Sequence, residues 1–292
     1  MKKTKDLKLN EWLKLSSEEK ELYLNPKKSV PDHQVYQKFA TKSADKFREV
    51  CKKKYLNLSY GHRPNQKLDI FLPDNNINNY AVQIYYHGGY WIGRDKYDHS
   101  HLALPAIKNN IIHVSVNYDL SPNVNIDVIV QEAYESILWV IKNIGNFGGN
   151  VNNINLIGHS AGAHLVAMAL TKNYKKKDFL NSATLISGIY QPQITKYISI
   201  NNIINISDET INLTDVYKHP LVNKTNFLLV VGDEEPNSWK MLTADYGDSL
   251  KNKNIPFIFY SAIKLNHFTI VRDLANPNSQ LAKKVLKMCQ KE

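Results

Sequence analysis

The sequence of 292 residues contains only two cysteines, Cys51 and Cys289. Two distant cysteines do not form the disulfide framework of a small secreted protein, and no Cys-x-x-Cys pair indicates a zinc or redox site. No apolar run approaches the roughly 20 residues that a membrane-spanning helix needs. The basic N-terminus also lacks the apolar core of a signal peptide. We therefore expect a protein of the reducing cytoplasm with no membrane segment.

Acidic residues are in deficit, because 27 Asp and Glu stand against 37 Lys and Arg, for a net charge of +10. Such an excess can indicate nucleic acid or an anionic membrane as a partner. The lysines are scattered, however, with only short runs at 52–54 and 175–177. A nucleic-acid interface would be a longer basic stripe with motif support. The charge is therefore interpreted as a solvated surface, with neither nucleic acid nor membrane as a partner.

Beyond residue 54, β-rich segments come to alternate with helical stretches. Continuous apolar segments such as 227–231 are typical of a parallel sheet buried on both faces, and the alternation predicts a doubly wound α/β sheet. Strands are predicted at 55–60, 67–72, 81–86, 111–118, 155–157, 183–186, 227–231 and 256–263, and helices at 34–51, 99–108, 127–142, 161–171, 238–250 and 279–288.

We expect a single domain over residues 1–292. A polar helical arm is predicted over 1–54, where Ser16 and the following acidic residues resemble a helix start. The Ile- and Asn-rich stretch 191–220 lies between two predicted strands and does not fit the alternation. It is expected to form a small cap over the C-terminal edge of the sheet, where active sites of open α/β sheets lie.

The strongest motif is Gly-His-Ser-Ala-Gly at 158–162, which matches the G-x-S-x-G nucleophile elbow. The serine of such an elbow lies on a strained strand-to-helix turn, which tolerates only small neighbours. An ordinary glycine-rich turn is the alternative. Because a predicted strand precedes the motif and a predicted helix follows it, the context favours Ser160 as a nucleophile.

The segment His-Gly-Gly-Tyr-Trp at 87–91 ends a predicted strand upstream of the serine, where α/β-hydrolases carry an oxyanion loop. Backbone N–H groups of Gly88, Gly89 and Ala161 are expected to stabilise a developing oxyanion. Losing one such donor typically costs on the order of 3 kcal/mol in the transition state. His87 is interpreted as a brace for the loop rather than as a base. The alternative, an ordinary strand-end turn, is disfavoured because both motifs occur in the expected order.

A triad in this fold follows the chain order Ser, acid, His. His267 follows the last predicted strand and precedes the final helix, a position that none of the nine other histidines shares. The acid should follow strand 227–231, where Asp233, Glu234 and Glu235 compete. Acids in this turn commonly stand three residues past its glycine, which favours Glu235 and leaves Asp233 as the alternative.

Asp95, Asp98, His99 and His101 could be interpreted as metal ligands. Alternate residues on a helix do not face one way, and no second cluster has the spacing of a zinc site. We therefore expect a polar loop and helix start here, and neither a metal nor a cofactor.

Taken together, these motifs resemble the eukaryotic kynurenine formamidases (arylformamidases), α/β-hydrolases with an H-G-G-x-W loop and a G-H-S-A-G-A-H elbow. Both occur here, and the similarity extends to residues 21–26, 67–73, 185–189 and 266–271. In that family the acid stands three residues after a glycine and an aromatic residue follows four further on. Glu235 and Trp239 match that spacing, although the family more often has Asp.

The resemblance implies an α/β-hydrolase fold and hydrolysis of N-formyl-L-kynurenine to L-kynurenine and formate in tryptophan catabolism. It implies a small-molecule substrate and is compatible with a homodimer. The aromatic leaving group would be lined by Tyr90 or Trp91, for which packing in the core is the alternative.

Three other functions compete with this interpretation. A general carboxylesterase or deacetylase would use the same machinery, since fold and triad do not define the acyl group. A non-catalytic ligand receptor usually lacks a triad member, whereas all three are available here. Nucleic-acid binding driven by the charge of +10 would be recognised by a salt-dependent shift of a DNA or RNA probe.

Overall fold

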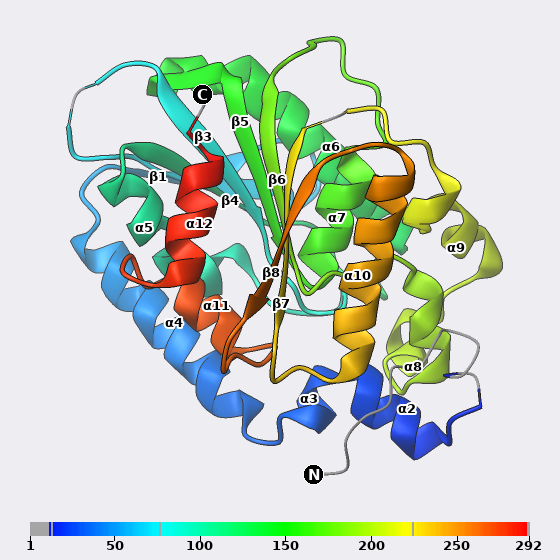
Figure 1. The fold of residues 1–292 in the computed structure, drawn as a ribbon. Coiled ribbons are helices and arrows are strands. Elements are labelled where there is room, and N and C mark those ends of the chain that lie inside the picture. Colours follow the sequence, from blue (N-terminus) through cyan, green and yellow to red (C-terminus); the bar gives the residue numbers. More distant parts are fainter. Residues whose placement is uncertain (1–11, 13, 76, 224, 291–292) are drawn as a thin grey trace.

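The computed structural model describes residue 12 and residues 14–75, 77–223 and 225–290. Their centre is an eight-stranded sheet in the order β1-β2-β4-β3-β5-β6-β7-β8 (Figure 1). Strands β3 to β8 run parallel to one another, and β2 is antiparallel to both β1 and β4. The predicted mostly parallel sheet is therefore confirmed. The strands are β1 Lys54–Ser59, β2 Lys67–Phe71, β3 Tyr80–Tyr86, β4 Ile111–Val116, β5 Gly149–His159, β6 Leu180–Ile186, β7 Asn226–Gly232 and β8 Phe257–Ala262.

Helices flank the sheet on both sides. One side carries α6 (Ile126–Asn143), α7 (Ala161–Ala169) and α10 (Asn237–Asn252), and the other carries α5 (Ala103–Lys108), α11 (Thr269–Leu274) and α12 (Gln280–Met288) (Figure 1). Two short 3₁₀ helices complete these layers, η1 (Lys96–Leu102) before α5 and η2 (Ile144–Phe147) after α6.

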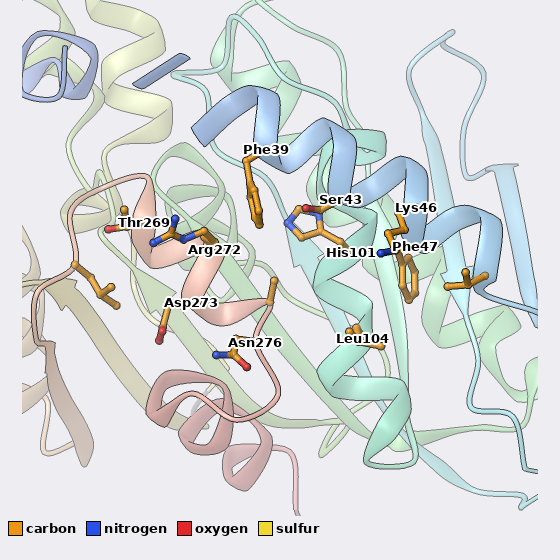
Figure 2. Close-up of a pocket in the computed structure, with 13 residues that line it drawn as sticks. Phe39, Ser43, Lys46, Phe47, His101, Leu104, Thr269, Arg272, Asp273 and Asn276 are labelled. Carbon is orange, nitrogen blue, oxygen red and sulfur yellow. The ribbon is translucent and has the colours of Figure 1, made fainter. Parts of the chain in front are cut away.

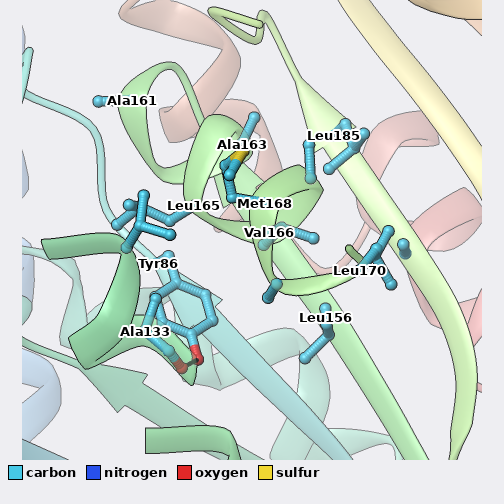
Figure 3. Packing of buried hydrophobic residues seen from close by; sticks show 14 of the residues in the cluster. Tyr86, Ala133, Leu156, Ala161, Ala163, Leu165, Val166, Met168, Leu170 and Leu185 are labelled. Carbon is cyan, nitrogen blue, oxygen red and sulfur yellow. Dashed lines mark hydrogen bonds between the residues drawn. The ribbon is translucent and has the colours of Figure 1, made fainter. Parts of the chain in front are cut away.

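Alternate residues of the central strands enter two different cores. Ile84 and Tyr86 of β3 belong to the larger cluster, which α6, α7 and α10 complete. The intervening Tyr85 belongs to a second cluster with residues of α11 and α12. Figure 3 shows part of the larger cluster, including Val166 and Met168 of α7. Because both faces of these strands are buried, their sequences are continuously apolar.

In its described part, the predicted arm contains α2 (Ser17–Leu24), α3 (Pro26–Ser29) and α4 (His33–Val50), and its first residues, 1–11 and 13, lie outside the described residues. The helix start predicted at Ser16 is confirmed by a capping box. The Glu19 N–H donates to Ser16 Oγ at 3.2 Å, and the Ser16 N–H donates to the Glu19 carboxylate at 2.9 Å.

The stretch expected to form a cap contains η3 (Pro192–Tyr197), α8 (Asn201–Ile204), α9 (Asp208–Thr214) and η4 (Val216–Lys218), all between β6 and β7. The arm contacts this insertion, since the N–H of Ser199 donates to the Glu21 carboxylate. The arm also contacts the loop after β3, where the Tyr90 hydroxyl donates to the carbonyl of Leu24. Residues far apart in the sequence therefore meet at the C-terminal edge of the sheet.

Two elements differ most from the predictions. The helix predicted at 99–108 divides into η1 and α5, because the Asp95 carboxylate accepts the N–H of Tyr97 at 2.7 Å and starts a 3₁₀ helix earlier. Strand β5 begins at Gly149, six residues before the predicted start. Its first residues are mostly polar and partly exposed, so no apolar run marks them as a strand. Within the residues described, no helix is both long and apolar enough to cross a bilayer.

Candidate active site

Ser160 lies at the turn between β5 and α7 with φ 56° and ψ −119°. A positive φ is uncommon for a residue with a side chain, and such conformations cluster at functional sites. The backbone is held by its surroundings, because the Ser160 N–H donates to the carbonyl of Ile186 on β6 at 2.8 Å. Ser160 is 2% exposed.

The two glycines of the motif are required by close packing. A Cβ atom on Gly158 would lie 2.2 Å from the carbonyl oxygen of Gly162. A Cβ atom on Gly162 would lie 2.0 Å from the carbonyl oxygen of Tyr86 on β3. The turn can therefore hold Ser160 in this position only if both neighbours lack a side chain.

His267 and Glu235 form a buried pair at the ends of the last two strands. Nδ1 of His267 lies 2.6 Å from Oε2 of Glu235, and the two residues are 4% and 3% exposed. The other carboxylate oxygen, Oε1, accepts hydrogen bonds from Ser187 Oγ at 2.5 Å and from the Gly232 N–H at 2.8 Å. These contacts fix the carboxylate and thereby the orientation of the imidazole.

The other two carboxylates of this turn lie elsewhere. Asp233 is half-buried, and its Oδ1 has no hydrogen-bond partner among the described residues. Glu234 is exposed. The geometry thus places Glu235, and neither Asp233 nor Glu234, in contact with His267.

Aromatic rings enclose His267. The ring of Trp239, on α10, lies 4.3 Å from it between centroids, and the ring of His159 lies 4.6 Å away. Burial, assisted by the neighbouring His267, lowers the pKa of His159 well below its ordinary value. His159 is therefore neutral at physiological pH and does not compete for the carboxylate as a cation.

Ser160 and His267 line one cavity of about 410 Å³ together with Gly88 and Gly89. The oxyanion loop approaches the serine closely, since a Cβ atom on Gly88 would lie 3.0 Å from Ser160 Cβ. Ala161 is the first residue of α7, so its N–H is among those that the helix leaves unpaired. The N–H groups predicted to form an oxyanion hole thus lie on the segments that meet at Ser160.

His87 is fully buried beneath the loop. Its Nδ1 lies 2.8 Å from the Gly88 carbonyl oxygen, and its Nε2 lies 3.2 Å from Asn117 Oδ1. The Tyr118 hydroxyl donates to the His87 carbonyl at 2.6 Å. These contacts are those of a residue that braces the loop.

The two aromatic residues of the loop have different surroundings. Tyr90 lines the cavity. Trp91 is fully buried in the core, with its ring 5.0 Å from that of His164 in an edge-on arrangement. Core packing therefore holds for Trp91, whereas Tyr90 belongs to the buried core and also lines the cavity.

Much of the cavity wall comes from segments that the motifs did not indicate. Helices α3 and α4 of the arm, with Asn25 before α3, supply one part of the wall, and the insertion after β6 supplies another. These residues are Asn25, Pro26, Lys27, Tyr36, Gln37, Ala40, Ile200 and Ile203. Ser187 was also missed as a contact of the acid, although its place directly after β6 was a signal for it.

A second cavity of about 670 Å³ lies between α4, α5 and α11 (Figure 2). Neither Ser160 nor His267 lines it. Of the polar cluster considered as metal ligands, His101 lines this second cavity, whereas His99 lines the first. In the described part of the chain, no three His, Cys, Asp or Glu side chains are grouped so that they could hold a metal ion.

Comparison with known proteins assigns the chain to a family. The BD-FAE family matches residues 68–249, which is more than half of the chain and includes the elbow, the oxyanion loop and Glu235. The chain belongs to the BD-FAE family.

The similarity of this BD-FAE family member to individual proteins extends beyond residues 68–249. Kynurenine formamidase of Danio rerio is 27% identical over 298 residues, which cover 97% of this chain and 100% of the relative. Isoprenylcysteine alpha-carbonyl methylesterase ICME of Arabidopsis thaliana is 36% identical over 121 residues, 41% of this chain and 28% of the relative. The predicted resemblance to kynurenine formamidases is therefore confirmed.

The fold is confirmed by a crystal structure from Silicibacter sp. TM1040. It superposes with a TM-score of 0.78 at 24% identity and covers 91% of this chain and 99% of its own. The BD-FAE family member thus has the α/β-hydrolase fold that its motifs predicted.

Proposed function

We propose that this protein is a serine hydrolase that cleaves N-formyl-L-kynurenine to L-kynurenine and formate. The observation that carries the proposal is the buried His267–Glu235 pair, with Nδ1 and Oε2 2.6 Å apart, in which His267 lines the same cavity as Ser160. Similarity to a kynurenine formamidase over 97% of the chain supports the substrate, and its similarity to a methylesterase also supports a hydrolase.

In the first half-reaction, Ser160 Oγ bonds to the formyl carbon while His267 accepts the hydroxyl proton. The carbonyl electron pair moves onto oxygen, where the N–H groups of Gly88, Gly89 and Ala161 stabilise the charge. When the carbonyl re-forms, the carbon–nitrogen bond breaks. Protonated His267 gives its proton to the arylamine nitrogen, and kynurenine leaves a formyl-serine behind.

In the second half-reaction, water bonds to the formyl carbon and gives a proton to His267. The carbonyl re-forms, the bond to Ser160 Oγ breaks, and the serine takes the proton back. Formic acid leaves and ionises to formate. Glu235 holds Nδ1 of His267 and stabilises the imidazolium that forms twice in the cycle.

The walls of the cavity suit an aromatic leaving group. The rings of Tyr36 and Phe268 are stacked, with centroids 6.4 Å apart and planes at 8°. Ile200 and Ile203 add apolar surface from the insertion after β6. An acyl group as small as formyl needs little room, so most of the cavity is available to the leaving group.

A general carboxylesterase is the second candidate. Its support is the similarity to the methylesterase ICME, which is 36% identical over 121 residues. An esterase would use the same serine, histidine and acid, so only substrates distinguish the two functions.

The test is spectrophotometric hydrolysis of N-formyl-L-kynurenine by purified protein beside p-nitrophenyl acetate and butyrate, with Ser160→Ala as the blank. Efficient deformylation with slower ester cleavage supports the formamidase. Rapid ester cleavage with formylkynurenine untouched favours the esterase. Folded protein that is inert toward all three substrates contradicts both proposals.

A further inference from the structure

The charged side chains that line the cavity of Ser160 are all cationic. Two of its lining residues are cations, Arg94 and Lys27, and none of the described lining residues is Asp or Glu. His99 and His159 do not add charge, because burial lowers the pKa of each well below its ordinary value, with smaller contributions from His87 and Arg94 for His99 and from His267 for His159. The positive charge therefore comes from Arg94 within the cavity and from exposed Lys27.

Arg94 lies next to the oxyanion loop. A Cβ atom on Gly89 would lie 3.0 Å from Arg94 Cγ, just as one on Gly88 would lie 3.0 Å from Ser160 Cβ. Arg94 also has a φ of 77°. Such a conformation in a residue with a side chain costs free energy and is common at ligand sites. The arginine stem therefore packs on the glycine beside the one that contacts the nucleophile.

The guanidinium has unused hydrogen-bonding capacity. Its side chain is 22% exposed, and its ion pair is a long one, with a nitrogen 3.5 Å from Asp98 Oδ2. The other oxygen of Asp98 accepts a hydrogen bond from Thr41 at 2.8 Å. Arg94 makes no hydrogen bond within the described part of the chain. A guanidinium has five N–H donors in a planar fork that matches a carboxylate.

We propose that Arg94 forms a carboxylate-binding subsite on the leaving-group side of this cavity, so that the enzyme selects acylated aromatic compounds that bear a carboxylate. The inference rests on the proposed function, because it assigns the leaving-group side of the same site. The aromatic ring lies against Tyr36 and Phe268, and the carboxylate pairs with the fork of Arg94. Arg94 is then a specificity residue, which binds substrate and takes no part in proton transfer.

The experiment compares substrates with and without a carboxylate, and the ester pair does so without the ammonium group of formylkynurenine. N-Formyl-L-kynurenine is paired with neutral 2′-formamidoacetophenone, and 3-(2-acetoxyphenyl)propanoate is paired with neutral phenyl acetate. Arg94→Met keeps the apolar stem and removes the fork, and Arg94→Lys keeps only the charge. Lys46→Met is the matched control, because it removes one exposed cation that lines the second cavity.

We expect Arg94→Met to lower the preference of kcat/KM for the carboxylate-bearing partner by about 10- to 100-fold, mainly through KM, since a bond to a charged group is lost. Arg94→Lys should recover part of the preference, and Lys46→Met should leave it intact. An equal loss on charged and neutral partners would mean that Arg94 is structural and would overturn the inference. So would an unchanged preference in Arg94→Met.

The ester pair separates this inference from the proposed function. If formylkynurenine is not cleaved but the ester pair shows the Arg94-dependent preference, the proposed substrate is wrong and the subsite stands. If no substrate is turned over, calorimetric titration with L-kynurenine and with neutral 2′-aminoacetophenone decides. Tighter binding of L-kynurenine that Arg94→Met abolishes supports the subsite, and equal binding of both compounds contradicts it.

Discussion

Nδ1 of His267 lies 2.6 Å from Oε2 of Glu235, and the same carboxylate accepts hydrogen bonds from Ser187 and Gly232. A carboxylate held by two donors and one imidazole has little freedom to rotate. It can therefore fix one tautomer of His267, with the proton on Nδ1 and the free electron pair of Nε2 available to the serine.

Glu235→Gln should lower kcat by about 10³- to 10⁴-fold, because an amide does not stabilise the imidazolium or enforce the tautomer. Asp233→Asn is the matched control two residues earlier in the turn, and it should stay close to wild type. Steady-state kinetics on the preferred substrate measures both. If the Asp233 variant is crippled and the Glu235 variant active, the acid is misassigned.

Ser160→Ala should abolish turnover and leave the fold intact, because alanine removes only the hydroxyl of a residue whose backbone is fixed by the Ile186 carbonyl. Circular dichroism and the melting temperature should match the wild type. Wild-type rates in the purified variant would show that another residue is the nucleophile.

The sheet could be predicted because its central strands are apolar on both faces, and each predicted strand overlaps an observed one. The start of β5 was missed, since its first residues are polar and partly exposed. Helix α11 was not predicted either. It has only six residues, Thr269–Leu274, and is too short for a periodic pattern to identify it.

The residues of the candidate site also divide into those that the sequence predicted and those that it did not. Ser160, His267 and the glycine motifs could be found because the elbow demands residue types at fixed spacing. Arg94 carries no such signal, and the arm residues that line the cavity depend on contacts such as that of Tyr90 with Leu24. These two residues are 66 positions apart, and they meet only because the arm packs against the loop after β3. The local sequence does not show where the arm packs, so these cavity residues could not be predicted.

Gly162→Ala should destabilise the protein by about 3 kcal/mol or more, because the added Cβ would lie 2.0 Å from the Tyr86 carbonyl oxygen and would force α7 away from β3. Gly145→Ala is the control, since a Cβ there meets nothing within 4 Å. Urea unfolding measures both free energies. Equal stability of the two variants would contradict the close packing of the elbow.

Glu132 predicts a pH dependence of stability. It is 1% exposed, and burial raises its pKa from 4.5 to about 7, although one oxygen accepts the Asp119 N–H at 2.7 Å. Because the folded pKa is the higher one, the folded state binds more protons between about pH 4.5 and pH 7, and stability falls as the pH rises through that window. Above that window the loss of folding stability is complete, at about 3 kcal/mol.

Glu132→Gln does not titrate, so its melting temperature relative to wild type should be several degrees higher at pH 8 than at pH 4.5. Glu18→Gln, on the exposed face of the arm, should show no such change, and a Glu132→Gln difference independent of pH would contradict the raised pKa.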